Sequence, residues 1–281
     1  MSVFYLVSII LGLAFQNVTQ KAYAGKTTGK GPYFFSFLVS LSAMLFFIIS
    51  SGSFSWNGGI VIYAALFAIS YTTYTVSSLC AFSNGSLSLT SLILSYSLVL
   101  PTVYGLFFLN EAFNLKMGVG ILLLVISLFL INQKNSKVPI TFKWVVFVIL
   151  AFIGNGMCSV FQKMQQVAFE GAYKNEFMIV ALAFVTVLIS FFVFKKERRE
   201  VKEYAKTGWY MPVACGIANG VVNLFVMVLS NLMPVSVMFP MISAGGIIIT
   251  YIISRFYYKE KLTRVQFLGF LIGILSVIFI S

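Results

Sequence analysis

The sequence predicts an all-α membrane protein with ten transmembrane helices, arranged as two inverted five-helix repeats. Three observations lead to this prediction: the composition, the recurrence of apolar runs and an internal repeat. Sixty per cent of the residues are hydrophobic and 9% are charged, with a mean hydropathy of +0.98. A soluble domain carries roughly 25% charged residues. Apolar runs of about 20 residues, the length needed to cross a bilayer as a helix, recur along the whole chain.

Short segments rich in turn-forming or charged residues separate these runs, such as "AGKTTGKGP" at 24–32 and "KKERREVKEYAK" at 195–206. No linker is long enough to separate independent soluble domains. The first run has no basic region before it, so we interpret it as a retained span and not as a signal peptide. The predicted spans are 3–23, 33–51, 59–82, 88–108, 114–132, 143–165, 175–195, 209–230, 235–257 and 262–280.

An internal repeat relates the two halves of the chain. Gly12 to Lys21 aligns without gaps with Gly154 to Lys163, matching Gly, Val, Gln and Lys. Further on, "NEAFNLKMGVG" at 110–120 matches "KEKLTRVQFLG" at 259–269. Each half holds five predicted spans, and an odd number forces the two copies into opposite orientations. Inverted repeats of this kind are typical of secondary transporters, whose substrate site lies near mid-membrane where the halves meet.

The basic residues predict the orientation in the membrane. The net charge is +12, and all but three of the 19 Lys and Arg residues fall on the side that holds the connections between spans 1–2, 3–4, 5–6, 7–8 and 9–10. Lys and Arg accumulate in cytoplasmic loops. We therefore predict a multi-pass protein of the cell membrane with both termini extracytoplasmic. The run "KKERRE" is expected to contact anionic lipid headgroups, and we expect no nucleic-acid partner.

Missing residue types exclude several kinds of function. The chain has no His and no Asp, since all seven acidic residues are Glu. This excludes a His-based zinc site, a Ser-His-Asp triad and a pair of catalytic aspartates. The sequence contains no Walker motif, so we do not expect an ATP-driven pump. Cys80, Cys158 and Cys215 lie far apart in apolar spans, where we interpret them as packing residues. We expect no enzymatic activity, no metal and no cofactor.

Polar residues at helical spacing mark a candidate binding site. In the first span Gly12, Gln16 and Gln20 lie four residues apart and share a helix face. A lysine facing lipid at mid-depth would cost a few kcal/mol, so these stripes are expected to face the bundle interior. The predicted substrate-binding residues are Gln16, Asn17, Gln20, Lys21, Tyr74, Asn155, Ser159, Gln162, Lys163, Asn219 and Asn223.

A purely structural interpretation of these residues stays open. Amides can hold helices together, at about 0.6 kcal/mol for each interhelical hydrogen bond. Lys21 can extend toward the cytoplasmic headgroups. Such a role does not, however, require the same Gln-Lys pair in both halves of the chain.

Two glutamates occupy equivalent positions after the fourth and ninth spans. We interpret Glu111 and Glu260 as caps of the helices that start near Asn114 and Thr263, because a carboxylate is stabilised at a helix N-terminus. The first span itself contains no acidic residue. We therefore expect facilitated diffusion or solute exchange in place of proton coupling.

The stretch 233–280 resembles the last segment of a repeat in the drug/metabolite transporter superfamily. The resemblance rests on Pro234, on the Gly245-Gly246 pair, on the Glu-x-Leu turn at Glu260, and on Gly269 with Gly273. The stretch "SLVLPTVYGLFFLNEAF" at 97–113 is similar more loosely. The resemblance implies the EamA-like branch, with a first five-helix repeat at 1–132 and a second at 143–281. The superfamily includes exporters of amino acids and drugs, and also carriers of nucleotide sugars and triose phosphates.

These observations together predict a secondary, non-ATP transporter that moves a small polar metabolite across the plasma membrane by alternating access. Lys21 and Lys163 have no acidic partner in their own helices, which favours an organic anion or a zwitterion as the solute. The alternatives are a non-transporting scaffold or receptor-like membrane protein, and an exporter of amino acids or drugs. A homodimer and either direction of transport are compatible with the sequence.

Overall fold

The computed structural model describes residues 2–28, 30–84, 90, 93–94, 96–111, 114–131, 141–256 and 264–280. Throughout these ranges the regular secondary structure is helical. The elements are α1 (Ser2–Lys26), α2 (Pro32–Ser50), α3 (Ile60–Asn84), α5 (Val99–Phe108), α6 (Leu115–Ile131), α7 (Phe142–Ala168), α8 (Lys174–Phe192), the π-helical turn η1 (Val193–Glu197), α9 (Val201–Gly208), α10 (Tyr210–Leu229), α11 (Val235–Phe256) and α12 (Arg264–Ile280).

Six of the described helices are long and apolar enough to cross a membrane. They are Ser2–Lys26, Pro32–Ser50, Ile60–Ala81, Phe142–Ala168, Lys174–Glu197 and Tyr210–Leu229. Shorter apolar helices occupy Val99–Phe108, Gly118–Ser127 and Val235–Gly246. The protein is therefore an all-helical membrane protein, and the number of ten spans stays a prediction.

The predicted span 88–108 is not one continuous helix over its described part. The chain turns at Ser97, and α5 begins only at Val99. Pro101 is the physical reason, because proline has no N–H with which to donate to the carbonyl four residues earlier. Leu100 N donates to Ser97 O instead, at 3.1 Å, which closes a turn.

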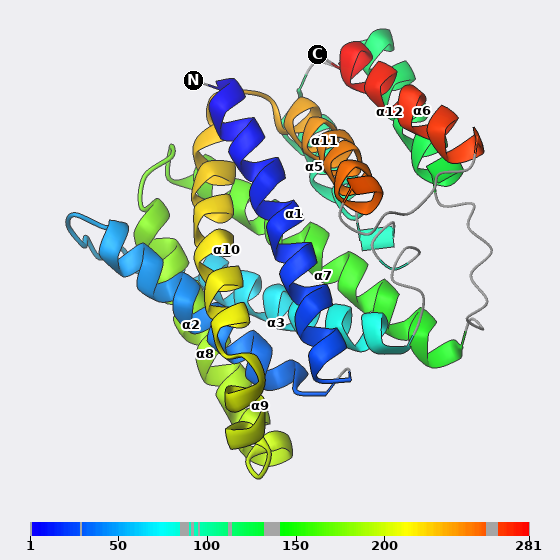
Figure 1. Ribbon diagram of the computed structural model, residues 1–281. Helices are drawn as coiled ribbons and strands as arrows, with labels where there is room; N and C mark the ends of the chain where they lie inside the picture. The colour runs from blue at the N-terminus through cyan, green and yellow to red at the C-terminus, as the bar shows by residue number, and fades with distance from the viewer. Residues whose placement is uncertain are drawn as a thin grey trace.

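The main helix contacts join the first half of the chain to the second (Figure 1). α1 packs against α10, and α3 packs against α7. α2 lies against α8, α5 against α11 and α6 against α12. The two halves therefore interdigitate and do not form separate bundles.

Two glycines that align in the internal repeat allow equivalent close approaches between helices. A Cβ atom built on Gly12 would lie 2.5 Å from Val222 Cγ2, where α1 meets α10. A Cβ atom built on Gly154 would lie 2.7 Å from Ser70 O and 2.8 Å from Tyr74 N, where α7 meets α3. Only a residue without a side chain permits α7 to contact the backbone of α3 at this distance.

The ends of the helical bundle differ in charge. Both termini lie at one end of the molecule, whereas α9 and the basic segment before it lie at the other (Figure 1). At this basic end the Glu197 carboxylate accepts hydrogen bonds from Tyr33 N at 3.2 Å and from Phe34 N at 2.7 Å. Glu197 thus caps the N-terminus of α2, where a negative charge is stabilised.

Candidate binding cavity

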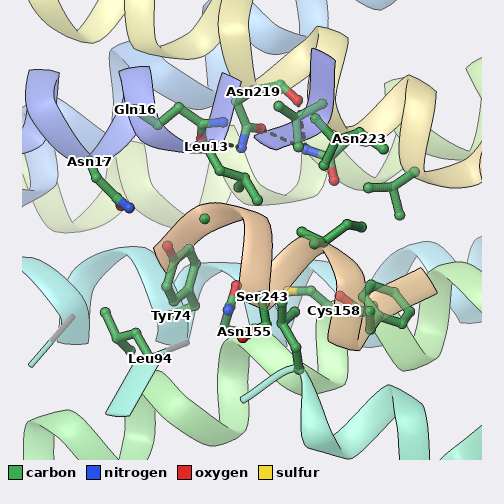
Figure 2. Close-up of a pocket in the computed structure, with 18 of the residues that line it drawn as sticks. Leu13, Gln16, Asn17, Tyr74, Leu94, Asn155, Cys158, Asn219, Asn223 and Ser243 are labelled. Carbon is green, nitrogen blue, oxygen red and sulfur yellow. Dashed lines mark hydrogen bonds between the residues drawn. The ribbon is translucent and has the colours of Figure 1, made fainter. Parts of the chain in front are cut away.

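A cavity of about 150 Å³ lies where α1, α3, α7, α10 and α11 meet, with Leu94 and Leu98 at its wall (Figure 2). Much of its lining is polar but uncharged. The polar lining residues are Gln16, Asn17, Tyr71, Tyr74, Asn155, Ser159, Gln162, Asn219, Asn223 and Ser243. Because these helices come from both halves of the chain, the cavity belongs to neither half alone.

Most of the predicted site residues line this cavity. Those that do are Gln16, Asn17, Tyr74, Asn155, Ser159, Gln162, Asn219 and Asn223. Gln20 lines an adjoining cavity of about 10 Å³. Lys163 is in neither lining, and the side chain of Lys21 lies outside the described part of the structure. Ser243 also lines the cavity, although we did not predict it, because it is a single polar residue in an apolar stretch.

A chain of hydrogen-bonded amides crosses the cavity wall. Gln162 Nε2 donates to Asn223 Oδ1 at 2.7 Å, and Asn223 Nδ2 donates to Asn219 Oδ1 at 2.9 Å. Asn219 Nδ2 in turn donates to Gln16 Oε1 at 3.0 Å, and the Tyr71 hydroxyl donates to Asn219 Oδ1 at 3.1 Å. Figure 2 shows the section between Gln16 and Asn223. The chain links α7, α10, α1 and α3, and it gives most of these buried groups the partner they require.

Lys163 does not supply the positive charge that we expected beside the cavity. Its Nζ donates to Ser230 O at 2.6 Å, immediately after the last residue of α10. Carbonyl groups at a helix C-terminus are favourable partners for a cation. No Lys, Arg or Glu belongs to the described lining of the cavity.

Glu111 caps a helix, as predicted, but the helix is α11 and not α6, which starts near Asn114. Its carboxylate accepts from Val235 N at 3.0 Å and from Ser236 N at 2.8 Å, at the N-terminus of α11. α6 has a cap of its own, since Asn114 Oδ1 accepts from Lys116 N at 3.2 Å. Glu111 is thereby left to bind a helix in the other half of the chain.

A third carboxylate also binds at an end of the bundle. Glu176 Oε1, at the start of α8, accepts from Ser55 N and from Ser55 Oγ, each at 3.1 Å. Glu260 lies outside the described residues, so its predicted cap has no outcome. The carboxylates described above therefore hold chain segments in place at the bundle ends and do not line the cavity.

Comparison with known proteins identifies the family. Residues 142–281 match the family model described as the EamA-like transporter family. Over this half, the chain belongs to that family. EamA-like proteins are part of the drug/metabolite transporter superfamily, as the resemblance in the sequence implied. No curated protein matches the chain.

The EamA-like chain also shares its fold with solved structures. A structure described as "Crystal structure of protein" superposes with a TM-score of 0.75, covering 100% of this chain and 96% of that chain. The two sequences are 11% identical, so the likeness shows the fold alone. Family membership therefore identifies a membrane protein of transporter type.

Proposed function

We propose that this EamA-like protein is a secondary transporter that moves a small polar metabolite across the plasma membrane by alternating access. The amide-lined cavity between the two halves of the chain is the observation that supports this proposal, because carriers of this design bind their solute between their repeats. Its volume of about 150 Å³ is below the roughly 300–1,000 Å³ of pockets that hold drug-sized ligands. The cavity thus suits a solute smaller than a drug.

Alternating access requires groups of helices that can move against one another around the cavity, and we assign these helices to two inverted five-helix repeats at 1–132 and 143–281. α1 of the first half packs against α10 of the second, and α7 of the second half packs against α3 of the first. This reciprocal packing supports the division into two repeats. The equivalent close approaches at Gly12 and Gly154 also support it. Placing the basic segment at 195–206 in the cytoplasm, against anionic lipid, leaves both termini extracytoplasmic.

The charge of the cavity favours a neutral or zwitterionic solute. A buried net charge without a partner is costly, and the described lining offers no formal charge. The sequence favoured an organic anion or a zwitterion because Lys163 had no acidic partner in its own helix. Since Lys163 binds Ser230 O, it no longer favours the organic anion. Solute exchange or facilitated diffusion fits the same lining. Accumulation that requires an imposed pH gradient would contradict that part of the proposal.

Counterflow tests the proposed function directly. The purified full chain is reconstituted into liposomes, which are loaded in turn with members of a library of small polar metabolites and with members of a second library of drugs. Uptake of labelled solute against its gradient, driven by unlabelled solute inside, is expected for at least one class. A correctly folded protein that supports no counterflow of any metabolite would instead indicate a scaffold or a receptor-like protein. Counterflow confined to drugs would indicate a drug exporter.

A further inference from the structure

The amide chain at the cavity has a fixed direction, which a backbone carbonyl sets. Asn223 Nδ2 donates to Asn219 O at 2.8 Å as well as to Asn219 Oδ1. A backbone carbonyl only accepts hydrogen bonds, so this end of Asn223 must be its NH₂ group. Its Oδ1 therefore faces Gln162, which has to present Nε2, as observed at 2.7 Å.

The same reasoning fixes the other end of the chain. Asn219 Oδ1 already accepts from Asn223 at 2.9 Å and from the Tyr71 hydroxyl at 3.1 Å. Its Nδ2 is consequently directed at Gln16 and requires an acceptor there, which is Gln16 Oε1 at 3.0 Å. The amide group of Gln16 then has only its Nε2 left to offer.

This terminal donor is buried and has no partner among the described residues. Gln16 is 7% exposed, and its Nε2 makes no hydrogen bond within the described structure. A buried donor left without an acceptor costs about 1–3 kcal/mol. Hydrogen bonds in series also polarise one another, which strengthens the donor at the end of the series. Gln16 borders both the main cavity and the smaller adjoining one, so an acceptor for its Nε2 would have to come from a molecule held in one of these two spaces.

The opposite wall of the cavity offers an acceptor. The Ser97 hydroxyl donates to Leu94 O at 2.6 Å, so its oxygen is left to accept from Asn155 Nδ2, also at 2.6 Å. With its NH₂ group occupied in this way, Asn155 presents its oxygen to a solute. Figure 2 shows Asn155 and Gln16 on different helices around the cavity.

We propose that Gln16 is a specificity-determining residue, whose Nε2 selects solutes that carry a carbonyl or carboxylate oxygen, while Asn155 accepts from an N–H or O–H group elsewhere on the solute. This inference rests on the proposed function of the cavity as a transport site. A carboxylate or carbonyl oxygen is a stronger acceptor than a hydroxyl group and satisfies the polarised donor best. The rival occupant is one water molecule in the smaller cavity, whose volume of about 10 Å³ is near the lower limit for a water.

Two matched pairs of small solutes test the assignment on the purified full chain. L-alanine is compared with L-alaninol, which lacks the carboxylate and is also a cation at neutral pH, and lactamide is compared with 1,2-propanediol. Both members of the second pair are neutral, so this pair separates the effect of the carbonyl oxygen from that of net charge. Binding is measured as the concentration-dependent rise in melting temperature. We expect the first member of each pair to bind at least tenfold more tightly. Equal binding of both members, or no binding of L-alanine and lactamide, would overturn the inference.

Two variants locate the preference at Gln16. Gln16→Glu keeps an oxygen for Asn219 but replaces the free donor, and it is expected to weaken binding of L-alanine and lactamide at least tenfold. Gln16→Met removes the donor without adding charge and decides the matter if the Glu variant does not fold. Gln166→Met is the control, because Gln166 is a buried amide of α7 outside both cavity linings. Unchanged binding in the Gln16→Met variant would assign the donor to a bound water only.

These outcomes are separate from those of the transport assay. Counterflow of a solute without a carbonyl or carboxylate oxygen would leave the proposed function intact while overturning the role of Gln16. Selective binding that depends on Gln16, without any counterflow, would contradict transport and preserve the role of Gln16.

Discussion

The Glu111 carboxylate, which follows α5, accepts a hydrogen bond from the backbone N–H of Val235 at the start of α11, 124 residues further along the chain. This contact joins the two halves of the molecule at a helix N-terminus. We expect Glu111→Ala to lower the free energy of unfolding by about 1–2 kcal/mol, because two backbone N–H groups lose their acceptor. Thermal unfolding in detergent measures the loss.

Glu203 provides the control for this prediction, since it is an exposed residue of α9. Replacing it by Ala is expected to change stability by less than about 0.5 kcal/mol. Equal stability of the two variants would show that the Glu111 contact does not hold α11 in place.

Gly154→Ala tests the close approach of α7 to α3. The added methyl group would meet backbone atoms of Ser70 and Tyr74, which cannot rotate away as a flexible side chain can. Overpacking of this kind costs about 1–3 kcal/mol, so a lower melting temperature is expected. Gly25→Ala in α1 is the matched control, because a Cβ atom there meets nothing within 4 Å and alanine favours the helix. A Gly154→Ala protein as stable as the control would be incompatible with the described helix contact.

Gly246 offers a way to fill the cavity without disturbing the fold. It lines the cavity, and a Cβ atom built on it meets no heavy atom within 4 Å. Gly246→Ala is therefore expected to fold and to transport nearly as the parent does. Gly246→Leu extends further into the cavity and is expected to reduce counterflow at least tenfold at a similar melting temperature. Full counterflow by the Leu variant would place the solute path elsewhere.

The topology is tested by labelling a cysteine introduced at Lys202, in the basic segment at 195–206. Replacing the three native cysteines first removes background labelling. An impermeant thiol reagent should label the new cysteine only after the cells are lysed, because we place this segment in the cytoplasm. Labelling in intact cells would reverse the orientation.

Most helices could be predicted from the sequence, because an apolar run of membrane length indicates a helix whatever other segments pack against it. Helical spacing also predicted the amide faces of α1, α7 and α10, and most of their residues reached the cavity. Partners were harder to predict, since periodicity defines a face but not the helix that covers it. We therefore predicted that Glu111 caps the helix near Asn114, whereas it caps α11. We also predicted that Lys163 belongs to the binding site, whereas its Nζ donates to Ser230 O at the end of α10. Only the packing of distant segments determines such contacts.

The claim that the amides of this cavity bind a transported solute is tested most directly by two variants of α7. Gln162 and Gln166 are both buried amides, one turn apart, and only Gln162 lines the cavity. Gln162 bonds to Asn223 and to Met178 Sδ, and Gln166 bonds to Asn231 and to Gln165. Each Leu variant therefore loses two side-chain hydrogen bonds, and both should lose a similar amount of stability, about 1–3 kcal/mol. Counterflow of the best library solute, normalised to folded protein in the liposomes, is the measurement. We predict that Gln162→Leu loses at least tenfold while Gln166→Leu stays within twofold of the parent, and equal counterflow in the two variants would contradict the account.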